Sequence, residues 1–253
     1  MSQHRDRLFT PSILVTSMIA LLSISNAMAQ EADSATEADE NVAPETMEEV
    51  VVYGIRRSLE TALDHFTFWS ETGAEDDYHC WWRYPNGQPE QKSCFLDVRE
   101  RAAEQPFYDM GDMALSPDEQ WLAWTEDTQG DERFTLWLKA LPNGTPRQLL
   151  SDIGPSVCWA EDQTADGATL LFTRFDDTQR PDSLWRLWVA FAEHAPMQTP
   201  TLVLREADPE FWVGVGKTRS KAWLIIESGS KDTTEVLALP ADQPETPLVC
   251  LHA

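Results

Sequence analysis

The sequence predicts an all-β fold built from repeated four-stranded units, and three observations support this prediction. From Phe66 onward, short apolar stretches alternate with a period of two, as in half-buried strands. Pro and Gly interrupt the chain at short intervals and leave no room for long helices. A pattern of two hairpins recurs about every 40 to 55 residues, which is typical of propeller blades. We therefore predict a partial β-propeller of about three to four blades after a disordered acidic linker.

Residues 1–29 are predicted to be a signal peptide. Arg5 and Arg7 give a positive start, Ile13–Ile24 is an apolar run, and Ala27–Ala29 is a small-residue cleavage site. Because a spanning helix needs roughly 20 apolar residues, cleavage is favoured over an uncleaved membrane anchor. The mature protein is then expected in the periplasm or outside the cell, without a membrane contact.

The chain is strongly acidic, with 19 Lys and Arg residues against 43 Asp and Glu residues and a formal net charge of −24. Such a charge repels nucleic acids and anionic lipids, so neither is an expected partner. It keeps a protein soluble or attracts cationic peptides, and both interpretations stay open.

Residues 30–65 are predicted to be a disordered acidic linker, because most of this stretch is polar and acidic and offers little apolar surface to bury. Within it, Val50–Val52 is a β-branched run ended by Gly54, and Ser58–Leu63 favours one or two helical turns.

Residues 47–64 resemble the start of TonB-dependent outer-membrane receptors, through the run Glu48-Glu-Val-Val-Val-Tyr-Gly-Ile-Arg56 and the Ser-Leu and Ala-Leu-Asp that follow. The resemblance implies that Glu48–Tyr53 adds a strand to a TonB-like partner protein. An inherited leader without a partner is the alternative. No receptor plug or barrel sequence continues after Asp64.

Four cysteines in an exported chain allow three sets of disulfide pairings. Cys80 and Cys94 are the candidate pair, because they lie at equal distances on either side of Gly87, where a hairpin turn would set them opposite each other. Two unpaired thiols are the alternative. The sequence has no Cys-x-x-Cys and its histidines are scattered, so no metal site and no cofactor are expected.

Residues 66–253 are predicted to form the propeller part. A partial first unit comes from short strands within 66–96. Three further units follow, and each consists of two hairpins. The first hairpins of these units are Met113–Trp124, Val157–Thr173 and Phe211–Glu227. The second hairpins lie within 134–150, 184–204 and 235–251. The 11 Trp residues are expected to fill the space between blades rather than to form a sugar-binding row.

An ordered set of motifs resembles the amino-terminal propeller of the prolyl oligopeptidase family, and within it oligopeptidase B (protease II). The set includes Ser116-Pro-Asp118 followed by Leu122-Ala-Trp124, Asp127-Thr-Gln-Gly-Asp-Glu132, Val157-Cys-Trp-Ala160 and Phe211-Trp-Val-Gly-Val-Gly-Lys-Thr-Arg-Ser220. In that family a seven-bladed propeller caps an α/β-hydrolase domain with a Ser-Asp-His triad and admits short peptides. The resemblance therefore implies a substrate-gating portion of a serine-type endopeptidase that cuts after Arg or Lys.

No catalytic residue is assigned in this chain. A nucleophile elbow needs Gly-x-Ser-x-Gly, and the nearest match, Gly154-Pro-Ser-Val-Cys158, ends in Cys. We predict a chain that is inactive alone, a fragment or fused remnant of a longer enzyme. The expected partners are the missing propeller half and hydrolase domain, or a second copy of the chain, and short cationic peptides.

Four charged residues are candidates for a substrate channel. Lys217 and Arg219 lie in the Gly-Lys-Thr-Arg-Ser loop, and Asp131 and Glu132 form an acidic loop that would hold a cationic substrate. Ordinary turn chemistry is the alternative for both loops. The second function hypothesis is a periplasmic interaction protein that uses its TonB-receptor-like segment.

Overall fold

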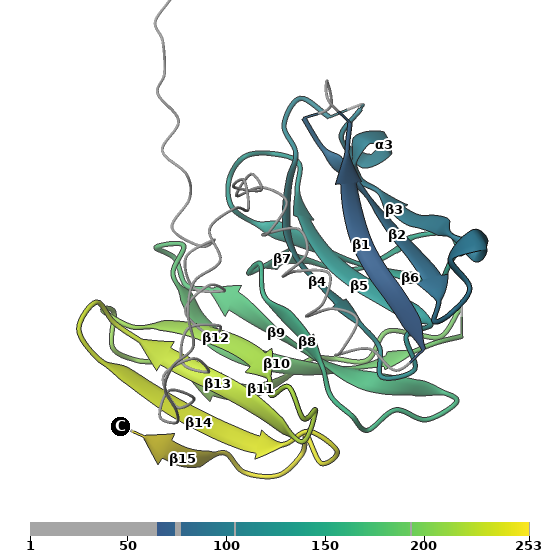
Figure 1. Ribbon diagram of the computed structural model, residues 1–253. Coiled ribbons are helices and arrows are strands. Elements are labelled where there is room, and N and C mark those ends of the chain that lie inside the picture. Colours follow the sequence, from purple (N-terminus) through teal and green to yellow (C-terminus); the bar gives the residue numbers. More distant parts are fainter. Residues whose placement is uncertain (1–64, 74–76, 104, 193, 253) are drawn as a thin grey trace, which may run out of the picture. The chain divides into compact units, whose positions relative to one another are not determined.

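The computed structural model describes residues 65–73, 77–103, 105–192 and 194–252. The chain divides into two units, Met1–Glu45 and Thr46–Ala253, and all the described residues belong to the second. The predicted signal peptide and the TonB-receptor-like segment lie outside the described residues. The described part forms fifteen strands in four antiparallel sheets that follow one another along the chain (Figure 1). This confirms the predicted all-β fold.

The first sheet has three strands in the order β1-β2-β3. Their bounds are β1 Phe66–Thr72, β2 His79–Pro85 and β3 Ser93–Asp97, with the 3-10 turn η2 Pro89–Gln91 before β3 and the helix α3 Val98–Ala102 after it. Asp97 begins α3, because its carboxylate accepts a hydrogen bond from the Arg99 backbone N–H at 3.0 Å. The sequence pattern predicted the strands but not α3.

The second, third and fourth sheets each have four strands in which every strand pairs with its neighbour in the chain. The second sheet contains β4 Asp109–Leu115, β5 Trp121–Asp127, β6 Phe134–Ala140 and β7 Arg147–Ile153. The third contains β8 Val157–Trp159, β9 Gly167–Phe175, β10 Pro181–Ala190 and β11 Thr201–Arg205. The fourth contains β12 Trp212–Lys217, β13 Trp223–Gly229, β14 Thr234–Pro240 and β15 Val249–His252.

The first strands of these three sheets contact one another in sequence, β4 with β8 and β8 with β12, as the inner strands of propeller blades do. We call the end where first and second strands join the first-hairpin end, and the end where second and third strands join the second-hairpin end. A hydrogen bond from the Asp118 backbone N–H to the Gln163 side chain, at 3.2 Å, connects two turns at the first-hairpin end.

Three apolar clusters lie between consecutive sheets. Trp124 and Phe95 belong to the cluster between the first and second sheets, Trp159 and Leu136 to the next, and Leu224 with its neighbours to the last; all of these side chains are buried. The part of the chain that the structure describes contains no helix whose length and hydropathy would suit a membrane span. The core lies between facing sheets, and Val98 and Ala102 of α3 add to the first cluster.

Candidate functional site

A buried polar network joins α3 to the second sheet. The Glu126 carboxylate, only 4% exposed, accepts hydrogen bonds from Arg101 Nε at 3.1 Å, from Tyr108 Oη at 3.0 Å and from Trp124 Nε1 at 3.1 Å. Arg101 Nη2 also forms an ion pair with Glu126. Burial and the neighbouring carboxylate both raise the pKa of Tyr108, which therefore stays protonated. For Arg101, burial has the largest single effect and lowers the pKa, but the hydrogen bond and charge of Glu126, together with Tyr108, raise the pKa overall, and the guanidinium stays charged.

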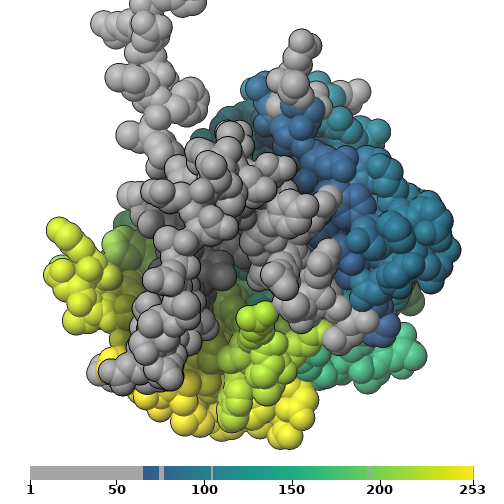
Figure 2. Space-filling view, viewed as in Figure 1, coloured from purple at the N-terminus to yellow at the C-terminus, as the bar shows by residue number. Residues whose placement is uncertain are grey.

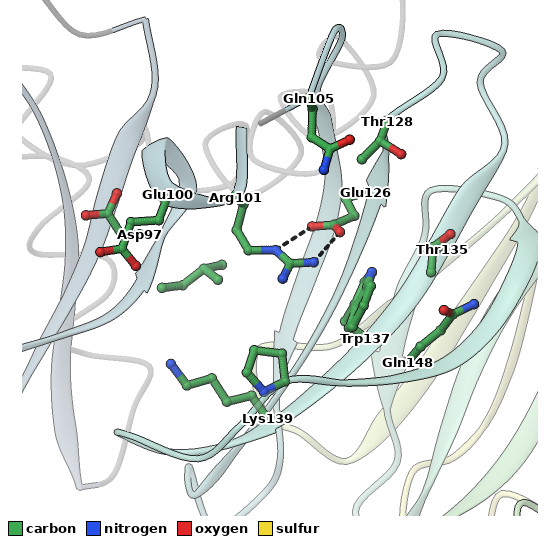
Figure 3. A pocket seen from close by; sticks show the side chains of 12 residues that line it. Asp97, Glu100, Arg101, Gln105, Glu126, Thr128, Thr135, Trp137, Lys139 and Gln148 are labelled. Carbon is green, nitrogen blue, oxygen red and sulfur yellow. Dashed lines mark hydrogen bonds and ion pairs between the residues drawn. The ribbon is translucent and has the colours of Figure 1, made fainter. Parts of the chain in front are cut away.

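A polar cavity of about 660 Å³ lies beside this network (Figure 3). Arg101 forms one wall and lies 4.5 Å from the centre of the Trp137 ring. Lys139 forms another wall and donates a hydrogen bond to the Phe95 carbonyl at 2.8 Å, which ties β6 to β3. Burial lowers the pKa of Lys139, while the charge of Glu100 opposes this change. Among the described residues that line the cavity there is no Ser, Cys or His, and its walls offer mainly charged and amide groups.

The structure places the predicted channel residues Lys217 and Arg219 at the first-hairpin end of the fourth sheet. Lys217 ends β12 and forms an ion pair with Glu161, which lies in the loop between β8 and β9 of the third sheet. Arg219 is exposed in the following turn. Lys217 therefore joins two sheets rather than projecting alone into solvent.

The other two predicted channel residues, Asp131 and Glu132, are exposed in the turn between β5 and β6, at the second-hairpin end. Asp127 organises this turn by accepting hydrogen bonds from backbone N–H groups, including those of Gly130 and Glu132, each at 2.9 Å. The Asp131 carbonyl accepts a hydrogen bond at 3.0 Å from Gln179, which lies in the turn between β9 and β10. The acidic pair and the basic pair thus lie at opposite ends of the sheets, and the structure does not bring them together.

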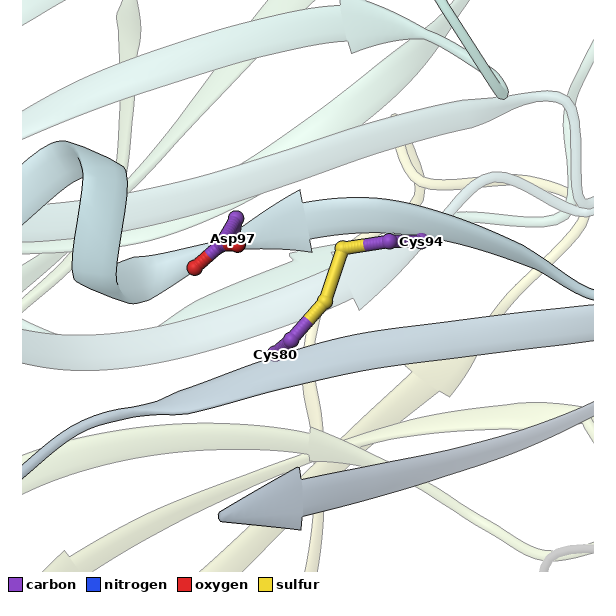
Figure 4. A group of neighbouring side chains, drawn as sticks. All are labelled: Cys80, Cys94 and Asp97. Carbon is purple, nitrogen blue, oxygen red and sulfur yellow. A yellow bond between two sulfur atoms is a disulfide. The ribbon is translucent and has the colours of Figure 1, made fainter. Parts of the chain in front are cut away.

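A disulfide joins Cys80 in β2 to Cys94 in β3, with their Cα atoms 6.5 Å apart (Figure 4). The two residues are not direct partners in the sheet, because Cys80 pairs with Asp97 while Cys94 pairs with Trp82 across an irregularity in the register. The Asp97 carboxylate lies within 4.8 Å of both sulfur atoms. Because metal binding requires thiolates, the oxidised pair is not a metal site.

Two groups on the first strands, the partly buried Asp112 and the buried Cys158, were not predicted from the sequence. Asp112 follows Gly111 at an irregularity in the pairing of β4 with β5, and its carboxylate accepts a hydrogen bond from the Val157 N–H of β8 at 3.3 Å. Burial raises the pKa of Asp112 to about 6. The Cys158 thiol is buried in β8, and burial raises its pKa to about 12, so that it is no nucleophile at neutral pH.

One face of the fourth sheet carries large apolar side chains that are about half exposed, with Glu227 among them. By the strand register, Trp212, Trp223 and Val249 lie on this face, and their side chains are 51%, 45% and 56% exposed. On the same face of β12, a Cβ atom placed on Gly214 or Gly216 would have no other atom within 4 Å. Residues of both the first sheet, in blue, and the fourth sheet, in yellow, are at the surface in Figure 2.

The matching positions of the other first strands are also small, but they are covered. Ala114 of β4 lies under Trp159 of the third sheet, whose Nε1 donates to the Ala114 carbonyl at 3.1 Å. Cys158 and Ala160, at the end of β8, pack against the cluster formed with the fourth sheet. The first strand of the fourth sheet therefore also has small residues on this face, but no further sheet among the described residues packs against them.

Comparisons with known proteins agree with this architecture. Residues 22–252 match the family model described as prolyl oligopeptidase, N-terminal beta-propeller domain. Protease 2 from Moraxella lacunata is 29% identical over 155 residues, which are 60% of this chain and 21% of the relative. Dipeptidyl aminopeptidase BI from Pseudoxanthomonas mexicana is 30% identical over 154 residues, which are 59% of this chain and 20% of the relative.

Solved structures show the same fold at low sequence identity. Oligopeptidase B from Leishmania major superimposes with a TM-score of 0.63 at 18% identity, over 81% of this chain and 31% of that one. Oligopeptidase B from Trypanosoma brucei has a TM-score of 0.62 at 20% identity, over 81% of this chain and 30% of that one. The chain spans about a fifth of the length of the curated relatives. It belongs to the prolyl oligopeptidase family, in which it corresponds to the N-terminal β-propeller domain.

Proposed function

We propose that this chain is the substrate-gating propeller portion of a serine-type oligopeptidase similar to oligopeptidase B, and that it hydrolyses no peptide bond by itself. The observation that carries this proposal is the combination of four blade-like sheets with a sequence of 253 residues that contains no Gly-x-Ser-x-Gly. No Ser, Cys or His is found among the described residues that line the polar cavity between the first two sheets. The hydrolytic centre is then supplied by a hydrolase domain outside these residues.

The exposed apolar side chains on the outer face of the fourth sheet support the proposal that a further blade packs against this sheet. Trp212 and Trp223 are about half exposed, whereas Trp124 and Trp159, at two of the three interfaces between sheets, are buried. Burying such aromatic faces is favourable by roughly 25 cal/mol per Å² of apolar surface. A neighbouring blade, in the same polypeptide or in a partner, would cover them.

Short cationic peptides are the proposed substrates of the whole enzyme. The net charge of −24 attracts Arg- and Lys-containing peptides, and the exposed pair Asp131 and Glu132 adds local negative charge at the second-hairpin end. The predicted signal peptide and the Cys80–Cys94 disulfide support a periplasmic or secreted location.

A peptidase assay tests the lack of activity. The purified chain is incubated with fluorogenic arginyl and lysyl peptides, with and without a serine-directed phosphonate. We expect no turnover above the buffer rate. Hydrolysis that the phosphonate abolishes overturns the proposal.

Sedimentation tests the uncovered face. We expect the unmodified chain to self-associate in the absence of a further blade, and the double variant Trp212→Ser/Trp223→Ser to stay monomeric. Met197→Ser is the matched control, because Met197 is also 51% exposed but lies outside the fourth sheet. Equal sedimentation of all three proteins argues against a blade-covering role for this face.

A further inference from the structure

In the part of the chain that the structure describes, the first sheet has three strands, whereas each of the other sheets has four. In those sheets the second strand lies between the first and the third, whereas β1 pairs only with β2. In an antiparallel sheet every second residue of an edge strand directs its N–H and C=O groups away from its neighbour. Within the described ranges no strand pairs with that edge of β1, and such edges are normally covered or blocked.

The direction of β1 identifies which strand is absent. β1 begins at the first-hairpin end, where the backbone N–H of Phe66 donates to Glu119 Oε2 at 3.0 Å and Arg83 Nη1 donates to the Glu119 carbonyl at 2.8 Å. Glu119 lies in the turn that precedes β5, so β1 and β5 start at the same end and run the same way. β1 therefore has the position in the first sheet that β5 has in the second sheet. The position that corresponds to β4, the first strand of a blade, is the one not filled by any described strand of the first sheet. A strand in that position would lie next to β4.

The exposure of side chains on β4 also indicates an unfilled strand position in the first sheet. Trp159 of β8 and Val213 of β12, which face the preceding sheet, are 1% and 3% exposed. Met113 and Leu115 of β4 also pack toward the preceding sheet, but they are only partly buried. A first strand in the first sheet would cover them.

We propose that Val50–Tyr53 of this same chain forms the missing strand, antiparallel to β1 and in contact with β4. Val50–Val52 is the only run of three β-branched residues between positions 31 and 65, and a continuous β-branched run suits a strand that is buried on both faces. The match to the propeller family begins at residue 22 and so includes this segment. The occupant is thus a part of the domain rather than a separate molecule.

The connection has the right direction and ample length. A strand that runs toward the first-hairpin end would finish near the start of β1, as β4 does before β5. Residues 54–65 then form the turn, and a chain of this length reaches roughly 40 Å when extended, against about 5 Å between paired strands. The segment that resembles a TonB-receptor leader would in this way complete the first sheet. A partner protein could bind it only by displacing it from β1.

Amide hydrogen exchange of the full chain tests the proposal. Proline has no N–H and is excluded from paired strand positions, so Val51→Pro should detach the segment. We expect the β1 amides that point away from β2 to exchange about tenfold faster or more in this variant. Amides of β9 and β13, measured in the same sample, report whether the other sheets stay folded. Ala35→Pro, in the acidic stretch, is the matched control and should leave β1 unchanged.

Three results overturn the proposal. The first is rapid exchange of those β1 amides in the unmodified chain, at the rate of amides in an unfolded chain of the same sequence. The second is protection that survives Val51→Pro but disappears on dilution, which assigns the edge to a second copy of the chain. The third is protection that survives both changes, which assigns it to another segment. The proposal is independent of the peptidase assay, because it concerns the first sheet alone.

Discussion

Arg101 in α3 and Glu126 in β5 are paired across the boundary between the first and second sheets, with Arg101 Nε 3.1 Å from Glu126 Oε2. Tyr108 and Trp124 donate to the same carboxylate, so four groups from three parts of the chain meet at one buried point. Within the described residues, this network and the apolar cluster beside it connect the first sheet to the second.

Replacing Glu126 should loosen that attachment. In Glu126→Gln the hydrogen-bond acceptor for Tyr108 and Trp124 persists, but the Arg101 guanidinium remains in place without its counter-charge. We expect the free energy of unfolding to fall by about 3 kcal/mol, as for other broken buried pairs. Urea unfolding at pH 7 measures this loss. Arg133→Gln, which removes an exposed pair with Asp152, is the control and should have a much smaller effect. Equal losses for both variants contradict the assigned role.

Asp112 should make the stability of the protein depend on pH. Its folded pKa is raised from 3.8 to about 6, so folding favours the protonated carboxyl. This contribution is complete below pH 3.8 and is lost as the pH rises through 6, which amounts to up to about 3 kcal/mol. Urea unfolding from pH 4 to pH 7.5 should show a steeper decrease for the unmodified protein than for Asp112→Asn. Parallel curves for the two proteins would show that Asp112 titrates normally.

The disulfide between Cys80 and Cys94 should stabilise the three-stranded sheet by restricting the unfolded chain. The two residues are 14 positions apart, and closing a loop of this size is worth about 3 kcal/mol in the chain-entropy description. We expect Cys80→Ser/Cys94→Ser to lower the free energy of unfolding by about this amount. Dithiothreitol should lower the stability of the unmodified protein similarly and leave the variant unchanged. A reductant effect of equal size on both proteins places the sensitive thiols elsewhere.

Two glycines should respond in opposite ways to alanine. A Cβ at Gly154 would lie 2.3 Å from Thr173 Oγ1 in the buried interface between sheets, so Gly154→Ala should cost about 1–3 kcal/mol. A Cβ at Gly216 meets no atom, and Gly216→Ala should stabilise the isolated chain by about 0.5 kcal/mol through the entropy of the unfolded state. Thermal unfolding ranks the two variants. Destabilisation by Gly216→Ala would mean that this face is already covered.

The strand repeats were predictable because they depend on local patterns. Alternating apolar residues and the Ser116-Pro-Asp118 turn specify a hairpin without help from distant residues, and the hairpin of β4 and β5 appears where they predict it. The turn itself is closed by local bonds, such as Ser116 Oγ to Asp118 Oδ1 at 2.6 Å. The propeller architecture followed from the repetition of this unit.

Features that depend on distant residues were not predictable. The pairing of Arg101 with Glu126 joins residues 25 positions apart, and no pattern in either segment indicates it. Equal spacing about Gly87 suggested that Cys80 would face Cys94, but η2 and the register irregularity shift Cys80 opposite Asp97. The charged channel candidates were chosen by loop composition, which does not specify the end of the sheet at which a loop lies.

The two remaining cysteines differ in accessibility, and this difference allows selective labelling of the fourth sheet. The Cys158 thiol is inaccessible, whereas Cys250 is exposed in β15 at the sheet edge. A maleimide dye added to the folded, oxidised protein should therefore label Cys250 alone among the cysteines. Its fluorescence anisotropy would report in real time when another polypeptide docks beside β15, without any engineered label.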